Sequence, residues 1–338
     1  MGLNLRPILT VKNIEISYLS GKWITIDANN MLYQFLALIR SPDGRRLTDK
    51  KGMTTSHLIG LLYRTTKLIT EFDIYPVFVF DGSPPKFKSK ELEKRRRERQ
   101  KLRNEWEQAI ARHDFRTAWS KAVRMDSLTK EMIVDAKKLL SLLGLPQVQA
   151  PSEGEAQAAY MVKKGDANFC VSQDYDALLF GAPLVVRNLT FTGIRYLPSK
   201  GTAYKITPEL VVLEDVLAQL KITHDQLIQI ALLMGTDYNE GVFGIGPKKA
   251  LKLIRRFGSI ENLPKQIKNA LGEYQEIFNF FKNPPVTKKY TLTIGKIYKD
   301  RLIEFLCEEH DFNKKRVMAV LKKLEEKFEK QATLADFI

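Results

Sequence analysis

The sequence of 338 residues contains very little cysteine and no long apolar run. Its two cysteines, Cys170 and Cys307, are too few for a disulfide framework or a Cys-rich zinc site, which predicts a reducing environment. No apolar run reaches the roughly 18–20 residues of a membrane span, and the N-terminal segment lacks the apolar core of a signal peptide. We therefore expect no membrane partner.

Histidine is also scarce, and a nucleotide-binding motif is missing. The four histidines, His57, His113, His224 and His310, are scattered without the pairing of zinc ligands. No G-x-x-x-x-G-K-[ST] motif occurs, which disfavours an ATP-driven motor. What is present, 44% hydrophobic and 10% aromatic residues, is typical of a folded globular protein.

Positive charge is abundant but unevenly distributed. The formal net charge is +15, from 54 Lys and Arg against 39 Asp and Glu. Residues 86–103 hold 10 basic and 3 acidic residues, and residues 247–330 hold 20 and 11, whereas residues 104–238 hold 14 and 16. This balance favours nucleic acid as the partner. An acidic middle between two basic blocks also points to a divalent metal, because carboxylates alone repel phosphate.

Short apolar runs alternate with helix-length segments over the first two thirds of the chain. This alternation predicts an α/β fold with a central, mostly parallel twisted sheet flanked by helices. We expect a charged helical insertion near residues 86–138, entered at Pro84–Pro85, and only helices after Gly241. The predicted strands are Trp23–Asp27, Pro76–Asp81, Asn168–Ser172 and Pro183–Arg187. The predicted helices are Tyr33–Arg40, Ser56–Ile69, Thr129–Leu143, Glu155–Lys164, Asp225–Met234 and Pro247–Phe257.

Acidic residues follow three of the predicted strands. Asp27 and Asp81 end two of them, and Asp174 and Asp176 come shortly after a third. Ligands of open α/β sheets bind at this carboxyl edge. In extended chain the i,i+2 spacing of Asp174 and Asp176 turns both carboxylates to one side. Any single one of these residues could instead cap the following helix.

Three further acids have ordinary structural explanations when taken alone. Ser152 and Glu155 fit a helix capping box, although a helix start can also point Glu153 and Glu155 at a metal. Asp237 follows a helix, where turn or cap residues are common. Seven acids packed together would repel one another, and two Mg²⁺ or Mn²⁺ ions suit such oxygen ligands. Two such ions about 3.5–4 Å apart are the arrangement that cleaves phosphodiesters.

Five blocks that contain these acids resemble the flap endonucleases of the structure-specific 5′-nuclease superfamily, over essentially the whole chain. In sequence order the blocks are Ile-Asp27-Ala, Val-Phe-Asp81-Gly, Glu153-Gly-Glu155-Ala-Gln-Ala, Ser-Gln-Asp174-Tyr-Asp176 and Gly-Thr-Asp237-Tyr-Asn. The length and the stop after the tail look more like an archaeal member than a eukaryotic one. The resemblance implies a cytoplasmic protein in the first case and a nuclear one in the second.

The resemblance also implies the chemistry. One metal ion would be held by Asp27, Asp81, Glu153 and Glu155, and the second by Asp174, Asp176 and Asp237. The substrate would be branched DNA with a 5′ flap, cut near the junction during replication and repair, including the maturation of Okazaki fragments. Some 5′-3′ exonuclease activity would accompany it.

The basic stretch 86–103 is, by itself, most simply a solvated helix face. The resemblance implies instead a helical arch for the single-stranded flap, an insertion spanning 84–130. Lys88 and Arg95 match family positions that contact the scissile phosphate and would stabilise its charge. Tyr33 is either a core residue or, by the resemblance, an aromatic that stacks on a base.

A glycine-rich turn and the C-terminal tail extend the resemblance. Gly244, Gly246, Lys248 and Lys249 form either an ordinary helix connection or a helix-two-turn-helix that binds duplex backbone, often with K⁺. The last eight residues resemble a peptide that docks on the sliding clamp, although Ile338 replaces the usual aromatic. Gln331, Leu334 and Phe337 match the motif, and Ile338 keeps an apolar side chain at its last position.

We thus expect a nuclease core over 1–240, a duplex-binding helical region over 241–330 and a clamp-binding tail over 331–338. Three alternatives remain open. The first is a 5′ exonuclease or junction resolvase of the same superfamily, which would share the metals. The second is a non-catalytic, clamp-bound DNA-binding protein, which would not need the acids. The third is a Mg²⁺ phosphatase, for which Asp27 should be followed by a second Asp two residues later, where Asn29 stands.

Overall fold

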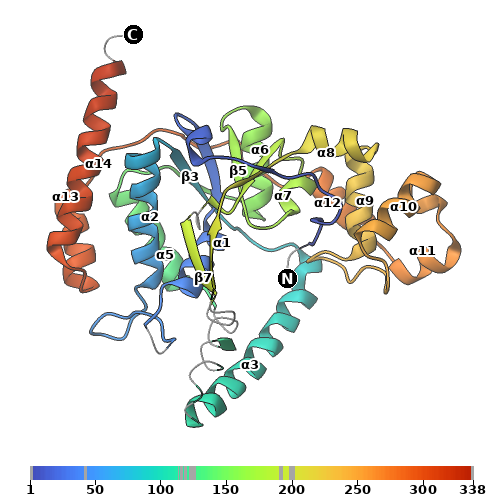
Figure 1. The fold of residues 1–338 in the computed structure, drawn as a ribbon, viewed down its shortest axis with the longest axis horizontal. Coiled ribbons are helices and arrows are strands. Elements are labelled where there is room, and N and C mark those ends of the chain that lie inside the picture. Colours follow the sequence, from blue (N-terminus) through green and yellow to red (C-terminus); the bar gives the residue numbers. More distant parts are fainter. Residues whose placement is uncertain are drawn as a thin grey trace.

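A twisted sheet with helices on both faces forms the body of the protein (Figure 1). The structure is a computed structural model, and it describes residues 3–41, 44–112, 114, 117, 120–121, 127–189, 193–197 and 202–335. Within these residues the main sheet has seven strands in the order β1-β9-β6-β5-β2-β3-β4. They are β1 (Lys12–Asn13), β2 (Trp23–Asp27), β3 (Tyr75–Phe80), β4 (Gln147–Gln149), β5 (Phe169–Val171), β6 (Leu184–Arg187) and β9 (Glu209–Val212).

The predicted mostly parallel sheet is confirmed. Strand β2 lies at the centre and pairs in parallel with β3 and β5, and the outer pairs β3–β4 and β5–β6 are also parallel. Only β9 runs against its neighbours β6 and β1. Because β2, β3 and β5 run the same way, their carboxyl ends meet at one edge, where the predicted site should lie.

Two hydrophobic clusters sandwich the sheet. Alternating side chains of β3 supply both, since Val77 and Val79 face one cluster and Phe78 and Phe80 the other. The helices on the first side are α6 (Gly154–Lys164), α7 (Asp176–Leu179), α8 (Leu213–Leu220), α9 (His224–Met234), α10 (Pro247–Phe257), α11 (Lys265–Leu271) and α12 (Gln275–Lys282). Those on the second are α1 (Ala28–Leu38), α2 (Ser56–Phe72), α5 (Lys130–Leu142), α13 (Lys299–Ile303), a π-helix (Glu304–Glu309) and α14 (Lys314–Ala335).

The expectation that the chain is entirely helical after Gly241 is wrong. Residues 283–298 form neither helix nor strand, because Pro284–Pro285 cannot continue α12. This segment crosses the body and is fixed by backbone bonds, such as that from Gly295 N to Gly144 O (2.7 Å). It leads to α13 and α14, which pack with α2 and α5 rather than with α10–α12. The predicted division at 241 stays a prediction, and the packing of 241–330 is shared between both sides of the sheet.

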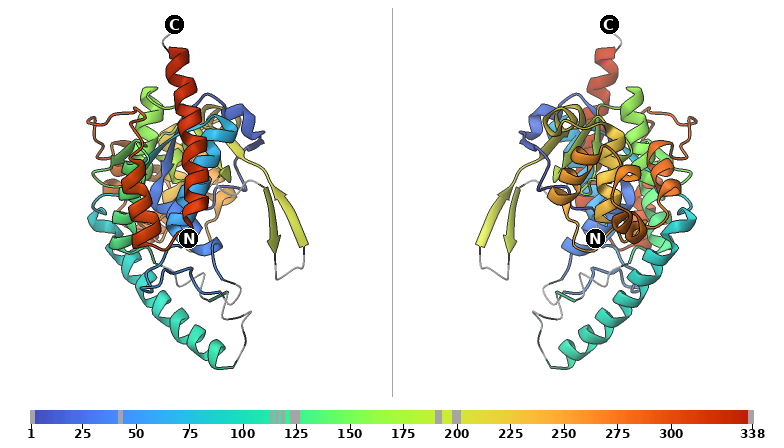
Figure 2. Two further views of the ribbon diagram at one scale, coloured as in Figure 1. Left: turned by 90° about the vertical axis from the view of Figure 1, so that its left-hand side faces the viewer. Right: turned by 90° about the vertical axis from the view of Figure 1, so that its right-hand side faces the viewer.

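Other boundaries differ from the predictions for local reasons. Helix α1 begins at Ala28 rather than Tyr33, because the carboxylate of Asp27 accepts a hydrogen bond from Asn30 N (2.9 Å) and caps the first turn. Strands β1, β4 and β9, which are two, three and four residues long, were not predicted. A separate hairpin, β7 (Gly193–Leu197) with β8 (Thr202–Ile206), stands out from the body (Figure 2).

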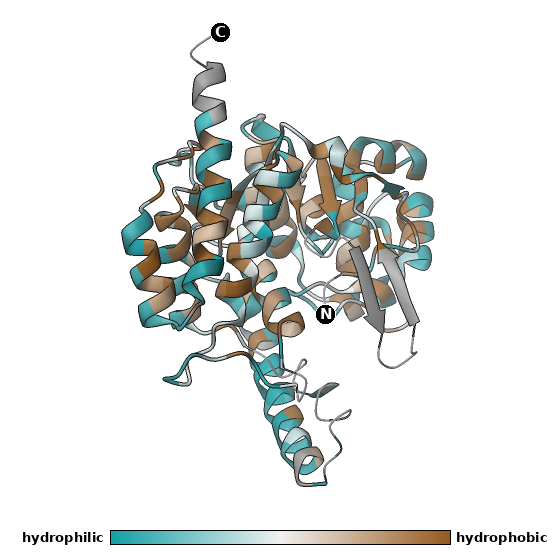
Figure 3. Ribbon diagram, turned by 60° about the vertical axis from the view of Figure 1, so that its left-hand side comes forward, coloured by the Kyte–Doolittle hydropathy of each residue, from teal (hydrophilic) through white to brown (hydrophobic). Residues whose placement is uncertain are grey.

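The charged insertion begins with a short 3₁₀ turn, η2 (Lys86–Lys88), followed by the 23-residue helix α3 (Ser89–Ala111). Helix α3 projects away from the body and is largely hydrophilic (Figures 1 and 3). Pairs such as Arg97–Glu93 (2.8 Å) stabilise its exposed surface. The predicted helical entry to the insertion is confirmed, and its far boundary at 130 stays a prediction. No described helix is both long and apolar enough to cross a membrane.

Helices α1 and α2 touch so closely that one glycine is required. A Cβ atom on Gly60 would lie 2.2 Å from a ring carbon of Phe35, which is itself buried in the core. Gly60→Ala should therefore lower the free energy of unfolding by about 1–3 kcal/mol through overpacking, against the helix-propensity gain of about 1 kcal/mol. Denaturant unfolding measures this change. Lys67→Ala, at an exposed position of α2, is the control and should stay within about 0.5 kcal/mol of wild type; a stabilised Gly60→Ala protein would contradict the close packing.

Candidate metal centre and nucleic-acid interface

The ends of β2 and β3 place the first two acids. Asp27 is the last residue of β2 and Asp81 directly follows β3, and these strands are paired in register. Asp81 Oδ1 accepts a hydrogen bond from Gly154 N (2.7 Å) at the start of α6. A Cβ atom on residue 154 would come within 2.9 Å of this oxygen, so glycine permits the close approach. The strand ends and the start of α6 therefore form one edge.

Glu153 and Glu155 stand at that start of α6, but the predicted capping box is wrong. The N-cap residue is Glu153, not Ser152, and its side chain makes no capping bond. Glu155 instead accepts a hydrogen bond from the hydroxyl of Ser172, beyond the end of β5. The carboxylate of Asp81 therefore accepts the hydrogen bond at the start of α6, and the two glutamates lie at the sheet edge.

Asp174, Asp176 and Asp237 complete the set. Residues 173–175 bend and Asp176 begins α7, so the expected extended conformation is wrong. Asp174 Oδ2 accepts a hydrogen bond from Asn30 Nδ2 (3.0 Å), which ties it to α1. Asp237 lies in the turn after α9, where Asn239 Nδ2 donates to Leu232 O (2.8 Å).

Electrostatic repulsion links the seven acids into one group. Burial raises the pKa of Asp27, Glu153, Glu155, Asp174 and Asp176, and repulsion from other members of the set adds to each shift. The pKa of Asp176 rises to about 8, with Asp174 and Asp237 as the main repelling neighbours. Such shifts in one cluster are typical of a functional site.

The donor set fits divalent cations of the Mg²⁺ kind. Every donor is a carboxylate oxygen, and the buried Asp176 Oδ1 has no hydrogen-bond partner. An unpartnered, buried carboxylate oxygen beside other carboxylates is suited to a hard metal ion. The described residues contain no preassembled cage of three or more acidic, histidine or cysteine ligands. Side-chain movement would therefore accompany binding, because two of the acids contact cationic side chains instead.

Those cations are Lys88 and Arg95, the two basic residues singled out from the sequence. Lys88 Nζ lies 2.7 Å from Glu153 Oε2, and an Arg95 guanidinium nitrogen lies 2.6 Å from Asp237 Oδ2. Burial alone would lower the pKa of Lys88, but the charge and hydrogen bond of Glu153 outweigh it and raise this pKa. Both residues lie near the start of α3 and contact carboxylates of the set, and their contact with a phosphate stays a prediction.

The other predicted DNA-contacting residues lie on different elements. Tyr33 is on α1, and 39% of it is exposed, so core packing does not account for it. Gly244 has a left-handed φ of 76°, and Gly246 caps α10, whose first residue is Pro247. Lys248 and Lys249 occupy the first turn of α10. The turn brings backbone N–H groups and two lysines to one helix start, which suits phosphate.

The predicted tail is described only in part. Gln331 and Leu334 belong to the backbone of α14, whereas Phe337 and Ile338 lie outside the described residues. The two cysteines are free, and Cys170 is buried.

Several supporting residues were not found from the sequence. Asn30 and Ser172 bond to acids of the site, and Arg187 Nε donates to Gln173 O (2.9 Å), holding the bend that carries Asp174. Arg187 also lies over the ring of Tyr175, 4.1 Å from its centroid. Arg187 is the last residue of a predicted strand, and this position could have identified it as a site residue, because the site lies at strand ends.

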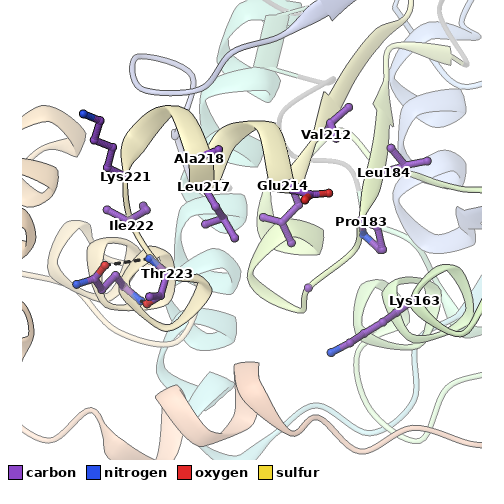
Figure 4. A pocket seen from close by; sticks show the side chains of 13 residues that line it. Lys163, Pro183, Leu184, Val212, Glu214, Leu217, Ala218, Lys221, Ile222 and Thr223 are labelled. Carbon is purple, nitrogen blue, oxygen red and sulfur yellow. Dashed lines mark hydrogen bonds between the residues drawn. The ribbon is translucent and has the colours of Figure 1, made fainter.

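A pocket of about 690 Å³ lies beside α8 (Figure 4). Apolar side chains such as Leu184, Leu217 and Ile222 line much of it. None of the seven acids lines it. The candidate site is therefore the open sheet edge, which suits a macromolecular ligand better than a small one.

Known proteins resemble this chain over nearly its whole length. Residues 2–102 match the XPG N-terminal domain and residues 144–237 the XPG I-region. Flap endonuclease 1 of Pyrococcus abyssi (strain GE5 / Orsay) is 50% identical over 337 residues, 99% of this chain and 97% of that protein. The structure of flap endonuclease-1 from Methanococcus jannaschii matches with a TM-score of 0.78 and 44% identity, covering 98% of this chain and 100% of that one.

A more distant structure shares the fold alone. The catalytic core of Rad2, solved in complex with a DNA substrate, matches with a TM-score of 0.71 at 24% identity, covering 96% of this chain and 100% of that one. The identity and coverage of the nearer relatives decide the family, and the order of the acidic blocks agrees with them. The chain belongs to the flap endonuclease family.

Proposed function

We propose that the protein is a structure-specific 5′ flap endonuclease that hydrolyses a phosphodiester bond of branched DNA with two divalent metal ions. The convergence of seven acids on one sheet edge, with Lys88 reaching them from η2 and Arg95 from α3, is the observation that carries this proposal. Family membership supports the flap as the substrate and replication and repair as the setting.

The acids divide into two groups according to which other carboxylate repels each one most strongly. Among the other carboxylates, Asp81 repels Asp27 most, and Asp237 repels Asp174 most. We assign Asp27, Asp81, Glu153 and Glu155 to one metal and Asp174, Asp176 and Asp237 to the other. Among the other carboxylates, Asp176 repels Glu155 most strongly, so Glu155 lies between the two groups. Two bound Mg²⁺ ions would supply an activated water and stabilise the leaving oxygen.

Lys88 and Arg95 would donate hydrogen bonds to the scissile phosphate. Both already contact carboxylates of the candidate metal centre, so a phosphate at that centre lies within their reach. Arginine offers a planar, bidentate donor and lysine a compact charge, which together can stabilise the added negative charge of the transition state.

The remaining parts would bind the DNA without reading its sequence. Helix α3 is the root of the arch for the single-stranded flap, and its basic surface suits phosphates. The turn with Gly244 and Gly246 and the lysines of α10 would contact one strand of the duplex, with K⁺ between loop and phosphate. Tyr33 would stack on a base near the cut.

Asp176→Asn should lower the single-turnover cleavage rate of a labelled 5′-flap DNA at least about 100-fold, because a metal ligand supplies several kcal/mol to the transition state. EDTA should abolish wild-type cleavage. Asp215→Asn is the control: Asp215 is an exposed acid paired with Lys12, and its loss should leave the rate unchanged.

The same assay separates the alternatives. Wild-type protein that ignores the flap but cuts a plain end or a four-way junction would be an exonuclease or a resolvase. Binding of flap DNA without any cleavage in Mg²⁺ or Mn²⁺ would point to a non-catalytic DNA-binding protein.

Metal binding should stabilise the fold more at high pH. The pKa of Asp176 is about 8 in the folded protein against about 4 in an unfolded chain. Ionisation therefore disfavours the metal-free fold progressively as the pH rises from about 4 toward 8. Because Mg²⁺ replaces protons, the rise in Tm on adding Mg²⁺ should be larger at about pH 8.5 than at about pH 6. Differential scanning fluorimetry measures it, and an equal rise at both values in wild type would reject the metal assignment of Asp176.

We also propose that residues 331–338 dock on a sliding clamp, on the strength of Gln331 and the apolar Leu334, Phe337 and Ile338. Removing 331–338 should abolish stimulation by the clamp and leave basal cleavage intact, because the tail lies far in sequence from every acid of the site. Steady-state cleavage with and without clamp measures both. A truncated protein that the clamp still stimulates would reject this role.

A further inference from the structure

Three aromatic rings meet where helix α3 joins the body. Phe87 comes from η2, Tyr238 directly follows Asp237, and Phe280 comes from α12. The ring centroids lie 5.3 Å apart for Phe87–Tyr238, 5.2 Å for Phe87–Phe280 and 5.4 Å for Tyr238–Phe280. All three pairs are close to perpendicular, at 76–84°. We call these three residues the aromatic triad.

The aromatic triad has a firm base in the core. Phe280 also contacts Phe180 at the end of α7 and the fully buried Phe281, with ring centroids 5.7 and 6.3 Å away. Tyr238 is 8% exposed and packs against Phe281 as well. Phe87 is therefore the one member that comes from the charged insertion, and it docks onto two rings that belong to the body.

Phe87 is followed directly by Lys88. The ammonium of Lys88 lies over the Tyr238 ring, 5.6 Å from its centroid, and 2.7 Å from Glu153 Oε2. A lysine side chain has many rotamers, and holding it in one place has an entropic cost. The docked Phe87 ring fixes the backbone at residue 87, and the Tyr238 face guides the adjacent side chain, since cations are attracted to aromatic faces.

We infer that the aromatic triad positions Lys88 over the metal centre, with Phe87 and Phe280 as positioning residues. Edge-to-face rings at these separations attract one another in addition to their burial. Phe280 is an apolar residue of α12 with ring contacts to both other members, so its effect on cleavage would pass through Phe87 and Tyr238. Phe280 thereby connects α12 to Phe87 in η2, just before α3, and to Tyr238, which directly follows Asp237. The inference rests on the proposed nuclease function.

A double-variant cycle on flap cleavage tests it. Phe87→Ala should lower the single-turnover rate by about tenfold with the Kd for flap DNA unchanged, because the two ring contacts that position Lys88 are lost. In a Lys88→Ala background the same substitution should change the rate by less than about twofold, because the side chain it positions is gone. Phe87→Tyr, which keeps the ring, should restore most of the rate.

Helix α12 provides a matched pair. Phe280 and Phe278 are both half-buried aromatics of this helix, but Phe278 lies outside the triad. Phe280→Leu should lower the single-turnover rate, and Phe278→Leu should stay within about twofold of wild type. Thermal unfolding of each variant checks that the fold is retained, and Phe87→Leu replaces Phe87→Ala in the cycle if the alanine variant unfolds.

The outcomes separate this inference from the proposed function. An inactive wild-type protein rejects the function itself. An active wild type in which the losses from Phe87→Ala and Lys88→Ala multiply overturns the positioning role, since the two residues would then act independently. Equal losses in Phe280→Leu and Phe278→Leu also overturn it, because general destabilisation of α12 would explain both.

Discussion

Repulsion among carboxylates at the edge of the sheet is the constraint on which the rest of the structure depends. Bringing seven acids together raises the pKa of their buried members, and the fold must supply the free energy that holds them. It does so with neutral donors fixed in the backbone and core. Gly154 N binds Asp81, Asn30 binds Asp174 and Ser172 binds Glu155. Each donor comes from an element other than that of its acid, so the sheet and its flanking helices support the site together.

The central part of this arrangement was predictable because it follows from local pattern and sheet topology. Apolar runs ending in Asp27 and Asp81 identify strands, and parallel strands bring their ends to one edge. The family resemblance then identified the remaining acids as a set. What lay beyond prediction depends on contacts distant in sequence. The capping box predicted at Ser152 does not form: the N-cap of α6 is Glu153, and Asp81, 73 residues from Gly154, accepts the hydrogen bond from the first backbone N–H of the helix.

Two further features could not be read from local pattern for the same reason. Local pattern marks the end of α12 at Pro284–Pro285 but not the path of the irregular segment 283–298, which is fixed by hydrogen bonds to residues as distant as Gly144. The aromatic triad joins residues 87, 238 and 280, each of which alone reads as an ordinary core residue. Sequence periodicity identifies an apolar face but not its partner, so side-chain geometry of this kind needs the three-dimensional structure.

The charge of the whole chain takes on a different meaning at the site. The protein carries +15 overall, yet the seven acids with Lys88 and Arg95 leave the site five charges negative when all are ionised. Two divalent ions would reduce this to one negative charge, and a bound phosphodiester would add another. Lys88 and Arg95 would then have a phosphate to contact in place of Glu153 and Asp237, which the metals would engage. The same two cations can therefore neutralise carboxylates in the metal-free site and contact phosphate in the substrate-bound site. Both roles require that Lys88 and Arg95 stay close to the carboxylates, and the aromatic triad anchors the backbone beside Lys88 in the core.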